Sequence, residues 1–133
     1  MIPARLDSTR LPGKLMMDLN GNPVILSTLL NTVKTNLFDD VYVVTDSEEI
    51  YNFLIKHHEN ILFSKENHDS GSDRIAEFAK DMQVDVIVNV QGDEPFIQPQ
   101  QINLIKNAFI QDKVEIATLI KPILHKEDLK FEN

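Results

Sequence analysis

The chain has 133 residues, which is enough for one domain with a buried core. Its net charge of −8 at pH 7 argues against nucleic acids and anionic membranes as partners, because both attract basic surfaces. The absence of cysteine excludes disulfides and thiolate metal sites and fits the reducing cytoplasm, where we expect the protein.

The first third of the chain predicts two strands separated by a helix. Residues 1–4 predict the end of a buried strand. Asn22 and Pro23 then form a favourable helix start, with Asn as the cap and Pro at the first position, for a helix over 24–35. Residues 41–45 are a continuous β-branched and aromatic run, which indicates a strand buried on both faces.

The rest of the chain continues this alternation. Asp46 and Glu49 have the spacing of a capping box, which predicts a helix that runs to about Lys56. The further elements that we expect are, in order, a strand at 61–63, a helix at 73–82, a strand at 84–90, a helix at 99–109 and a strand at 116–120.

Alternating strands and helices predict an α/β fold with a mainly parallel sheet between two layers of helices, a Rossmann-like three-layer arrangement. We expect one such domain over residues 1–133. Ligands of these sheets bind beyond the carboxyl ends of the strands, so the residues that follow each strand are the first candidates for a site.

A cationic loop follows the first expected strand. Residues 3–14 carry Arg5, Arg10 and Lys14 against a single acid, within a chain that is strongly acidic overall. Gly13 allows the backbone to approach a ligand closely. Arginine grips phosphate oxygens bidentately and lysine supplies a point charge, so a nucleoside triphosphate is the anion that suits the loop best. The alternative is a solvated surface loop with scattered cations.

A carboxylate, Asp93, follows the expected strand at 84–90. If this strand neighbours the first one, Asp93 faces the cationic loop across one crevice. Opposite a triphosphate, its natural role is to bind Mg²⁺, which takes one or two protein carboxylates together with phosphates and water. The alternative is an acidic turn, since Gly-Asp is a turn dipeptide. The role of Glu94 stays open.

Ser70, Gly71 and Arg74 precede or begin the helix expected at 73–82. They could contact a nucleobase or an anion. The alternative is plain helix capping by Ser72 or Asp73, with Arg74 in a salt bridge to Glu77 or Asp73. None of the four histidines forms a pair with metal-ligand spacing, and we assign none of them a catalytic role.

Six short segments of the chain, taken in order, form a recognisable set: 2–5, 8–14, 43–46, 68–74, 76–77 and 88–95. Together they resemble the 3-deoxy-manno-octulosonate (Kdo) cytidylyltransferase family of lipopolysaccharide biosynthesis. The resemblance implies a nucleotide-diphospho-sugar transferase-like fold. It also implies a Mg²⁺-dependent reaction in which CTP and Kdo give CMP-Kdo and pyrophosphate.

The resemblance also implies roles for individual residues. Those that it places on the nucleotide are Ala4, Arg5, Arg10, Lys14, Ser70, Gly71, Arg74 and Gln91. Among them, Arg10 and Lys14 would stabilise the departing pyrophosphate, and Ser70, Gly71 and Arg74 would contact the cytosine end. Gln91 would lie by the ribose or the sugar, and Asp93 would bind Mg²⁺. Arg10, Lys14 and Asp93 are thus the expected catalytic residues.

The chain departs from the family in its length and at Leu15, where the family usually has proline. Family members are nearly twice as long, so we expect the N-terminal half of a longer, homodimeric enzyme. The missing half would supply a second metal-binding aspartate and most of the sugar pocket. Two alternatives remain: a nucleotidyltransferase for another sugar acid, and a non-catalytic domain that binds CTP.

Overall fold

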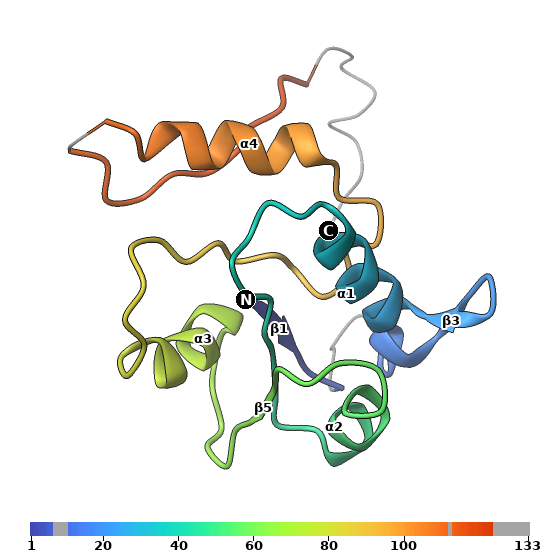
Figure 1. Cartoon of the computed structure of the whole chain (residues 1–133). Helices are drawn as coiled ribbons and strands as arrows, with labels where there is room; N and C mark the ends of the chain where they lie inside the picture. Colours follow the sequence, from blue (N-terminus) through green and yellow to red (C-terminus); the bar gives the residue numbers. More distant parts are fainter. Residues whose placement is uncertain (7–10, 112, 124–133) are drawn as a thin grey trace. The chain divides into compact units, whose positions relative to one another are not determined.

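The computed structural model describes residues 1–6, 11–111 and 113–123 of the chain. The chain divides into two compact units, Met1–Pro99 and Gln100–Asn133. The first unit contains the sheet and three α-helices, and the second contains most of α4 (Pro99–Ala108) (Figure 1). None of the helices in the described ranges is long and apolar enough to cross a membrane.

A parallel sheet forms the centre of the first unit. It consists of β1 (Ile2–Ala4), β4 (Val43–Thr45) and β5 (Ile61–Phe63), in the order β1-β4-β5. Every residue of β1 and β4 is buried, as their apolar, mostly β-branched composition predicts. The predicted α/β fold with a mainly parallel sheet is confirmed.

The segment 84–90 is not the full strand that its composition predicts. The amino group of Met1 donates a hydrogen bond to the Val88 carbonyl at 2.7 Å, and the Val90 amide donates one to the Met1 carbonyl at 3.0 Å. This parallel pattern places 88–90 beside β1, on the edge opposite β4. Residues 84–87 have no such pairing, because β1 is short and offers partner groups only around Met1. The segment 88–90 therefore neighbours the first strand, which is the condition under which we expected Asp93 to face the cationic loop, and the predicted length of the strand is wrong.

The strand predicted at 116–120 is absent, although this segment is described. Its apolar residues favour extended backbone, but a strand also needs a neighbour with which to exchange hydrogen bonds. Ile116 and Ile120 are each 90% exposed, so the segment lacks the burial that would stabilise a strand.

Helix α1 (Val24–Lys34) begins after a short hairpin, and not at an asparagine cap. Residues 22 and 23 form β3 (Asn22–Pro23), which pairs with β2 (Asp18–Leu19). The amide of Val24 donates to the Met17 carbonyl at 3.0 Å. Because the hairpin takes up the backbone of Asn22, the predicted cap is wrong.

Serines cap the next two helices. Ser47 accepts from the Ile50 amide at the start of α2 (Glu48–Leu54), where we expected Asp46 to cap. Ser70 accepts from the Asp73 amide at 3.1 Å, so α3 (Gly71–Ala79) begins two residues before the predicted start. Ser72 and Asp73 are therefore not its caps.

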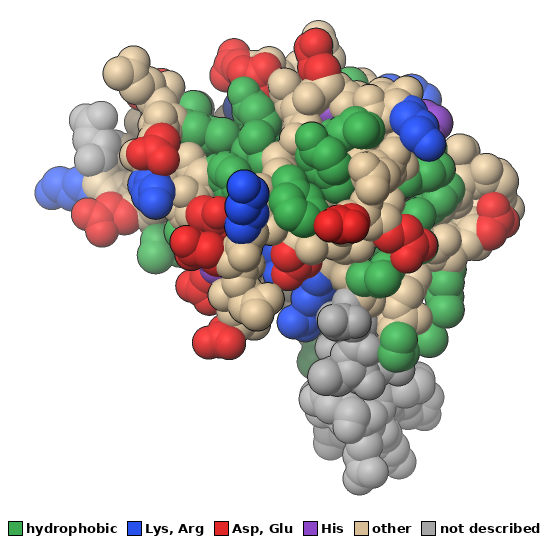
Figure 2. All heavy atoms as spheres, turned by 90° about the horizontal axis from the view of Figure 1, so that it is seen from below, with side chains coloured by type: hydrophobic (Ala, Val, Ile, Leu, Met, Phe, Trp, Pro, Cys, Tyr) green, Lys and Arg blue, Asp and Glu red, His purple; other side chains and the backbone are tan. Residues whose placement is uncertain are grey.

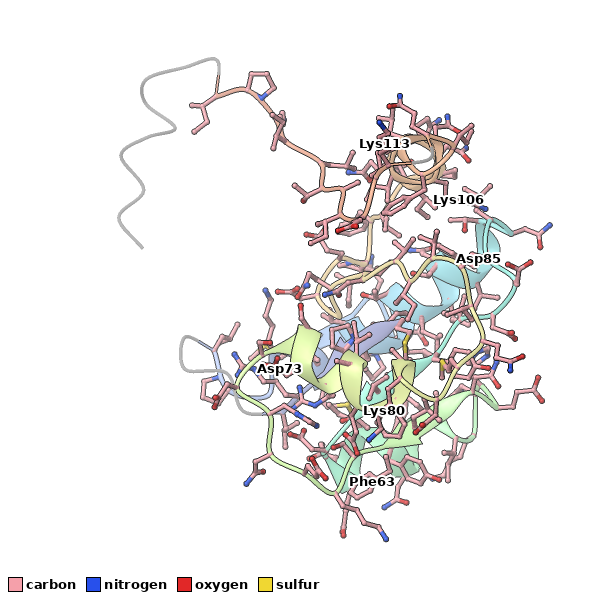
Figure 3. All side chains as sticks on the ribbon, turned by 90° about the vertical axis from the view of Figure 1, so that its left-hand side faces the viewer. Phe63, Asp73, Lys80, Asp85, Lys106 and Lys113 are labelled. Carbon is pink, nitrogen blue, oxygen red and sulfur yellow. The ribbon has the colours of Figure 1, made fainter. Side chains whose placement is uncertain are left out.

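Helices α2 and α3 pack on the sheet, α2 on β4 and β5 and α3 on β1 and β4. Ile50 and Leu54 of α2 are fully buried, and Ile75 of α3 is 6% exposed. Asp73 and Lys80 lie at opposite ends of α3, where their charges complement the helix dipole (Figure 3). The packing fixes the start of α3 near the carboxyl end of β1.

Candidate nucleotide-binding site

A polar cavity of about 400 Å³ lies at the carboxyl end of β1. Three segments line it: the residues that follow β1, the first turn of α3, and the residues that follow Val90. The expected site residues that line it are Arg5, Lys14, Ser70, Gly71, Arg74, Gln91 and Asp93. The structure thus brings the cationic and acidic loops to one crevice.

The other two expected site residues are Ala4 and Arg10. Ala4 is 1% exposed and lies within β1, where its Cα pairs with that of Thr45. Its role in a site is thus limited to its backbone. Arg10 lies outside the described residues.

Lys14 and Asp93 form an ion pair at the mouth of the cavity. The Lys14 Nζ lies 2.6 Å from Asp93 Oδ2, and the two side chains are 43% and 42% exposed. Solvent screens such a pair strongly, and exposed pairs contribute only about 0–1 kcal/mol to stability. The two charges can therefore part at little cost when a ligand offers each of them a partner.

The backbone around Asp93 is held tightly from two sides. The carbonyl of Gly92 accepts from the buried Thr28 Oγ1 at 2.8 Å. A Cβ at Gly92 would lie 2.9 Å from the Pro3 carbonyl oxygen and 3.3 Å from Leu15, so only glycine fits without a shift. This close approach fixes Asp93 opposite the residues that follow β1.

The loop that carries Lys14 is closed by its own backbone. The Gly13 amide donates to the Leu6 carbonyl at 3.0 Å, and Gly13 has a φ of 70°, in the left-handed region that favours glycine. Leu15, the next residue after Lys14, is buried against Gly92. The Lys14 side chain is therefore directed to the rim by a buried neighbour.

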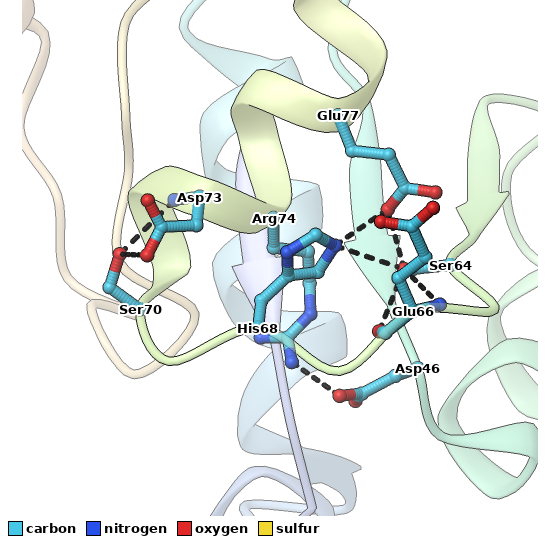
Figure 4. A network of polar contacts seen from close by, with 8 residues as sticks. All are labelled: Asp46, Ser64, Glu66, His68, Ser70, Asp73, Arg74 and Glu77. Carbon is cyan, nitrogen blue, oxygen red and sulfur yellow. Dashed lines mark hydrogen bonds and ion pairs between the residues drawn. The ribbon is translucent and has the colours of Figure 1, made fainter.

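Arg74 is buried at the base of the cavity. The residue is 2% exposed, and its Nη2 donates to Asp46 Oδ2, at the end of β4 (Figure 4). Neither of the predicted partners, Glu77 and Asp73, makes this pair. Among the described residues, Arg74 Nε has no hydrogen-bond partner. Arg74 also lines a second cavity, of about 440 Å³, together with Arg5, Asp46 and His68.

A second polar cluster lies beneath α3, and the sequence did not indicate it. The Glu77 carboxylate accepts from Ser64 Oγ and contacts His68 Nε2 at 2.8 Å (Figure 4). The Ser64 hydrogen bond lowers the pKa of Glu77 below its ordinary value, and His68 and Lys80 add to this shift while burial opposes it. The sequence held one sign of this cluster: Glu77 follows Arg74 by three residues and therefore lies on the same face of the helix.

Within the described ranges, no group of three or more His, Asp and Glu side chains is placed to hold a metal ion. Asp93 by itself provides a hard carboxylate at the mouth of the cavity. This fits Mg²⁺, which completes its coordination with substrate phosphates and water and needs few protein ligands. A single carboxylate is too few ligands for a metal site made by the described residues alone.

Comparisons with known proteins give the family. A family model described as cytidylyltransferase matches residues 1–133. The chain belongs to the cytidylyltransferase family. It is 44% identical to the 3-deoxy-manno-octulosonate cytidylyltransferase of Christiangramia forsetii and 43% identical to that of Flavobacterium johnsoniae. Each of these alignments covers 100% of this chain, but only 55% and 56% of the relative.

A solved structure agrees with this assignment. The structure of CMP:2-keto-3-deoxy-manno-octonic acid synthetase complexed with CTP matches 84% of this chain with a TM-score of 0.76 and 31% identity. The match covers 46% of that protein. The chain therefore spans about half the length of the relatives that it matches, and the resemblance seen in the sequence is confirmed.

Proposed function

We propose that the chain is the nucleotide-binding part of a cytidylyltransferase that transfers CMP from CTP to Kdo and releases pyrophosphate. The observation that carries the proposal is the meeting of Lys14 and Asp93 over a polar cavity at the carboxyl end of β1. The names of the relatives support CTP and Kdo as substrates. On the family resemblance, we propose that residues 1–133 form one domain, the N-terminal half of a cytoplasmic, homodimeric enzyme that acts in lipopolysaccharide biosynthesis.

In this function the cationic residues hold the triphosphate. Lys14 and Arg5 line the cavity, and the resemblance adds Arg10. The anomeric hydroxyl of the sugar attacks the α-phosphorus, and the bond from this atom to the bridging oxygen of pyrophosphate breaks. Such a reaction depends on positioning and charge stabilisation, so cations beside the leaving group lower the barrier. Lys14 and Arg10 are the residues that we assign to this task.

Asp93 is the residue that would hold Mg²⁺. When bound, the metal neutralises phosphate charge during the transfer. In the free protein Asp93 pairs with Lys14, so ligand binding requires an exchange of partners. Lys14 then contacts the phosphates, and the Asp93 carboxylate is free to bind the cation. The exchange costs little free energy, because the pair between Lys14 and Asp93 is exposed to solvent and weak.

The cytosine end lies against the first turn of α3. Gly71 packs on Pro3, since a Cβ added there would lie 3.0 Å from the proline ring, so the backbone of this turn is held against β1. Ser70 and Gly71 present backbone hydrogen-bonding groups to the nucleobase, and Arg74 lies at the base of the cavity. Gln91 is exposed and lines the same cavity, and on the family resemblance we assign it to the ribose or the sugar.

Calorimetric titration of the full chain with CTP and Mg²⁺, followed by an assay of pyrophosphate release with Kdo, tests the proposal. We expect CTP to bind more tightly than UTP and Kdo to trigger release. Absence of CTP binding would contradict the proposal. Release only with a different 2-keto sugar acid would favour the related nucleotidyltransferase. Binding without release agrees with a nucleotide-binding half and with a non-catalytic CTP-binding domain, and release by an enzyme that includes the second half would distinguish them.

The metal assignment has its own test in Asp93→Asn, which keeps the shape of the side chain. We expect this variant to lose most of the effect of Mg²⁺ on CTP affinity. An unchanged Mg²⁺ response would show that the ligand lies elsewhere. Glu94→Gln, at an exposed neighbouring position, is the matched control.

A further inference from the structure

We propose that Ser64, His68 and Glu77 are positioning residues for the base-contacting turn of α3, an inference that rests on the proposed CTP site. These three residues, which we call the Ser64 cluster, do not line the cavity at the carboxyl end of β1. They act by fixing the loop that leads into α3.

The loop begins at a rigid point. The amide of Ser64 donates to the Thr45 carbonyl at 2.8 Å, which extends the pairing between β5 and β4 by one residue. Ser64 itself is 1% exposed. Its Oγ accepts from the Glu66 amide at 3.2 Å, so the chain turns sharply as it leaves the sheet. The start of the loop thus has a fixed direction.

The middle of the loop is attached to α3. His68 Nε2 lies 2.8 Å from Glu77 Oε2 and 3.2 Å from Ser64 Oγ. The His68 and Glu77 side chains are only 11% and 20% exposed. Partly buried contacts of this kind are screened less by solvent than surface pairs. The loop is therefore fastened to the helix before it reaches the cavity.

The end of the loop is the base-contacting turn. Two residues after His68, Ser70 caps α3, and Gly71 packs against Pro3. Arg74 and Glu77 lie one turn apart on one face of α3, so the helix is held at Arg74 by Asp46 and at Glu77 by the Ser64 cluster. A change in the cluster would rotate or loosen this face and move the turn that carries Ser70 and Gly71.

The geometry does not make the cluster a catalytic triad. Serine hydrolases place serine on one histidine nitrogen and the carboxylate on the other. Here Ser64 and Glu77 both meet Nε2 of His68, and Ser64 is closed off from solvent. The Ser64 cluster therefore lacks the arrangement of a catalytic triad, and its contacts instead tie the loop to α3.

The test compares two probes, CTP and inorganic tripolyphosphate, on the full chain carrying His68→Ala. We expect CTP affinity to fall about tenfold, which is the size of effect typical of losing one hydrogen bond to a charged group, here the contact between His68 and Glu77. Tripolyphosphate affinity should be unchanged. Tripolyphosphate lacks the base and the ribose, so it makes none of the contacts that we propose for the turn that carries Ser70 and Gly71. A purely structural defect would lower the active fraction for both probes equally.

Two further variants keep the test decisive. His68→Gln can still donate a hydrogen bond to Glu77 and should bind CTP within about threefold of the unmodified chain. Glu77→Gln gives the same comparison if His68→Ala does not fold. His57→Ala and Glu49→Gln, at exposed positions of the α2 region, are the matched controls.

Equal loss of both probes, or unchanged CTP affinity in both His68→Ala and Glu77→Gln, would overturn the inference. Failure of the unmodified chain to bind CTP would instead overturn the proposed function itself. The two failures are therefore distinguishable in one set of titrations.

Discussion

Two ion pairs of the same chemical type lie at the cavity, and they differ in burial. The Lys14 and Asp93 side chains at the mouth are 43% and 42% exposed, whereas Arg74 at the base is 3% exposed and its partner Asp46 is 28% exposed. Water can solvate the first two charges when they part, whereas the Arg74 side chain, although it lines the cavity, is only 3% exposed and would be poorly solvated without Asp46. The mouth is thus suited to exchange partners with a ligand, and the base is suited to keep its shape.

The surface shows why the mouth needs local cations. Acidic side chains are spread over the face shown in Figure 2, in keeping with a net charge of −8. A triphosphate is repelled by such a surface at long range. In the proposed function, the cations that follow β1 provide the local attraction.

The largest effect that we expect comes from Lys14→Ala at the mouth. In the proposed function Lys14 stabilises the leaving pyrophosphate, so its loss should lower kcat for pyrophosphate release by about 10²–10³. The free energy of unfolding should change by less than about 0.5 kcal/mol, because the side chain is exposed. Kinetics and urea unfolding of the same preparation measure both.

Lys34→Ala, which removes an exposed lysine of α1, is the control for net charge. A Lys14→Ala variant with normal kcat would remove Lys14 from the mechanism. A variant with a large loss of stability would show that the mouth is also structural, and the contrast with the base would disappear.

The second prediction compares the two carboxylates directly. Asp46→Ala strands the Arg74 charge in the interior and should lower the free energy of unfolding by about 3 kcal/mol. Asp93→Ala leaves Lys14 in contact with water and should lower it by less than about 0.5 kcal/mol. Urea unfolding of both variants gives the two values. Equal losses would contradict the division between a replaceable and a fixed ion pair.

The three strands of the parallel sheet and the helices α1 to α4 could be predicted because each depends on local pattern, whereas the hairpin of β2 and β3 was missed and the strand predicted at 116–120 is absent. The β-branched run before Asp46 and the alternation of strands and helices are visible in the sequence, and the strand-end rule brings Lys14 and Asp93 together. The run and the alternation are local, but Lys14 and Asp93 meet only because residues 88–90 pair with β1, a distant contact that the sequence left as a condition.

Helix starts and strand lengths could not be predicted in the same way. Ser70, Ser72 and Asp73 are all good caps, and only the packing of Gly71 on Pro3 selects the first. Asp46 is a good cap as well, but Arg74, 28 residues away, takes its carboxylate. The Ser64 cluster was missed for the same reason, since its members come from a strand end, a loop and a helix.

The smallest effect concerns the pH dependence of stability beneath α3. The pKa of Glu77 is lowered from 4.5, chiefly by the Ser64 hydrogen bond and then by His68 and Lys80. The folded state therefore binds the Glu77 proton less readily than the unfolded chain does. The stability gained from this carboxylate is fully present above pH 4.5 and is lost as the pH falls through the lowered pKa.

Glu77→Gln should thus flatten the acid side of the plot of stability against pH, measured as urea midpoints along a pH series. Glu49→Gln, on the exposed face of α2, should leave this plot unchanged. Parallel profiles for Glu77→Gln and the unmodified chain would show that this carboxylate contributes nothing to holding the base of the cavity.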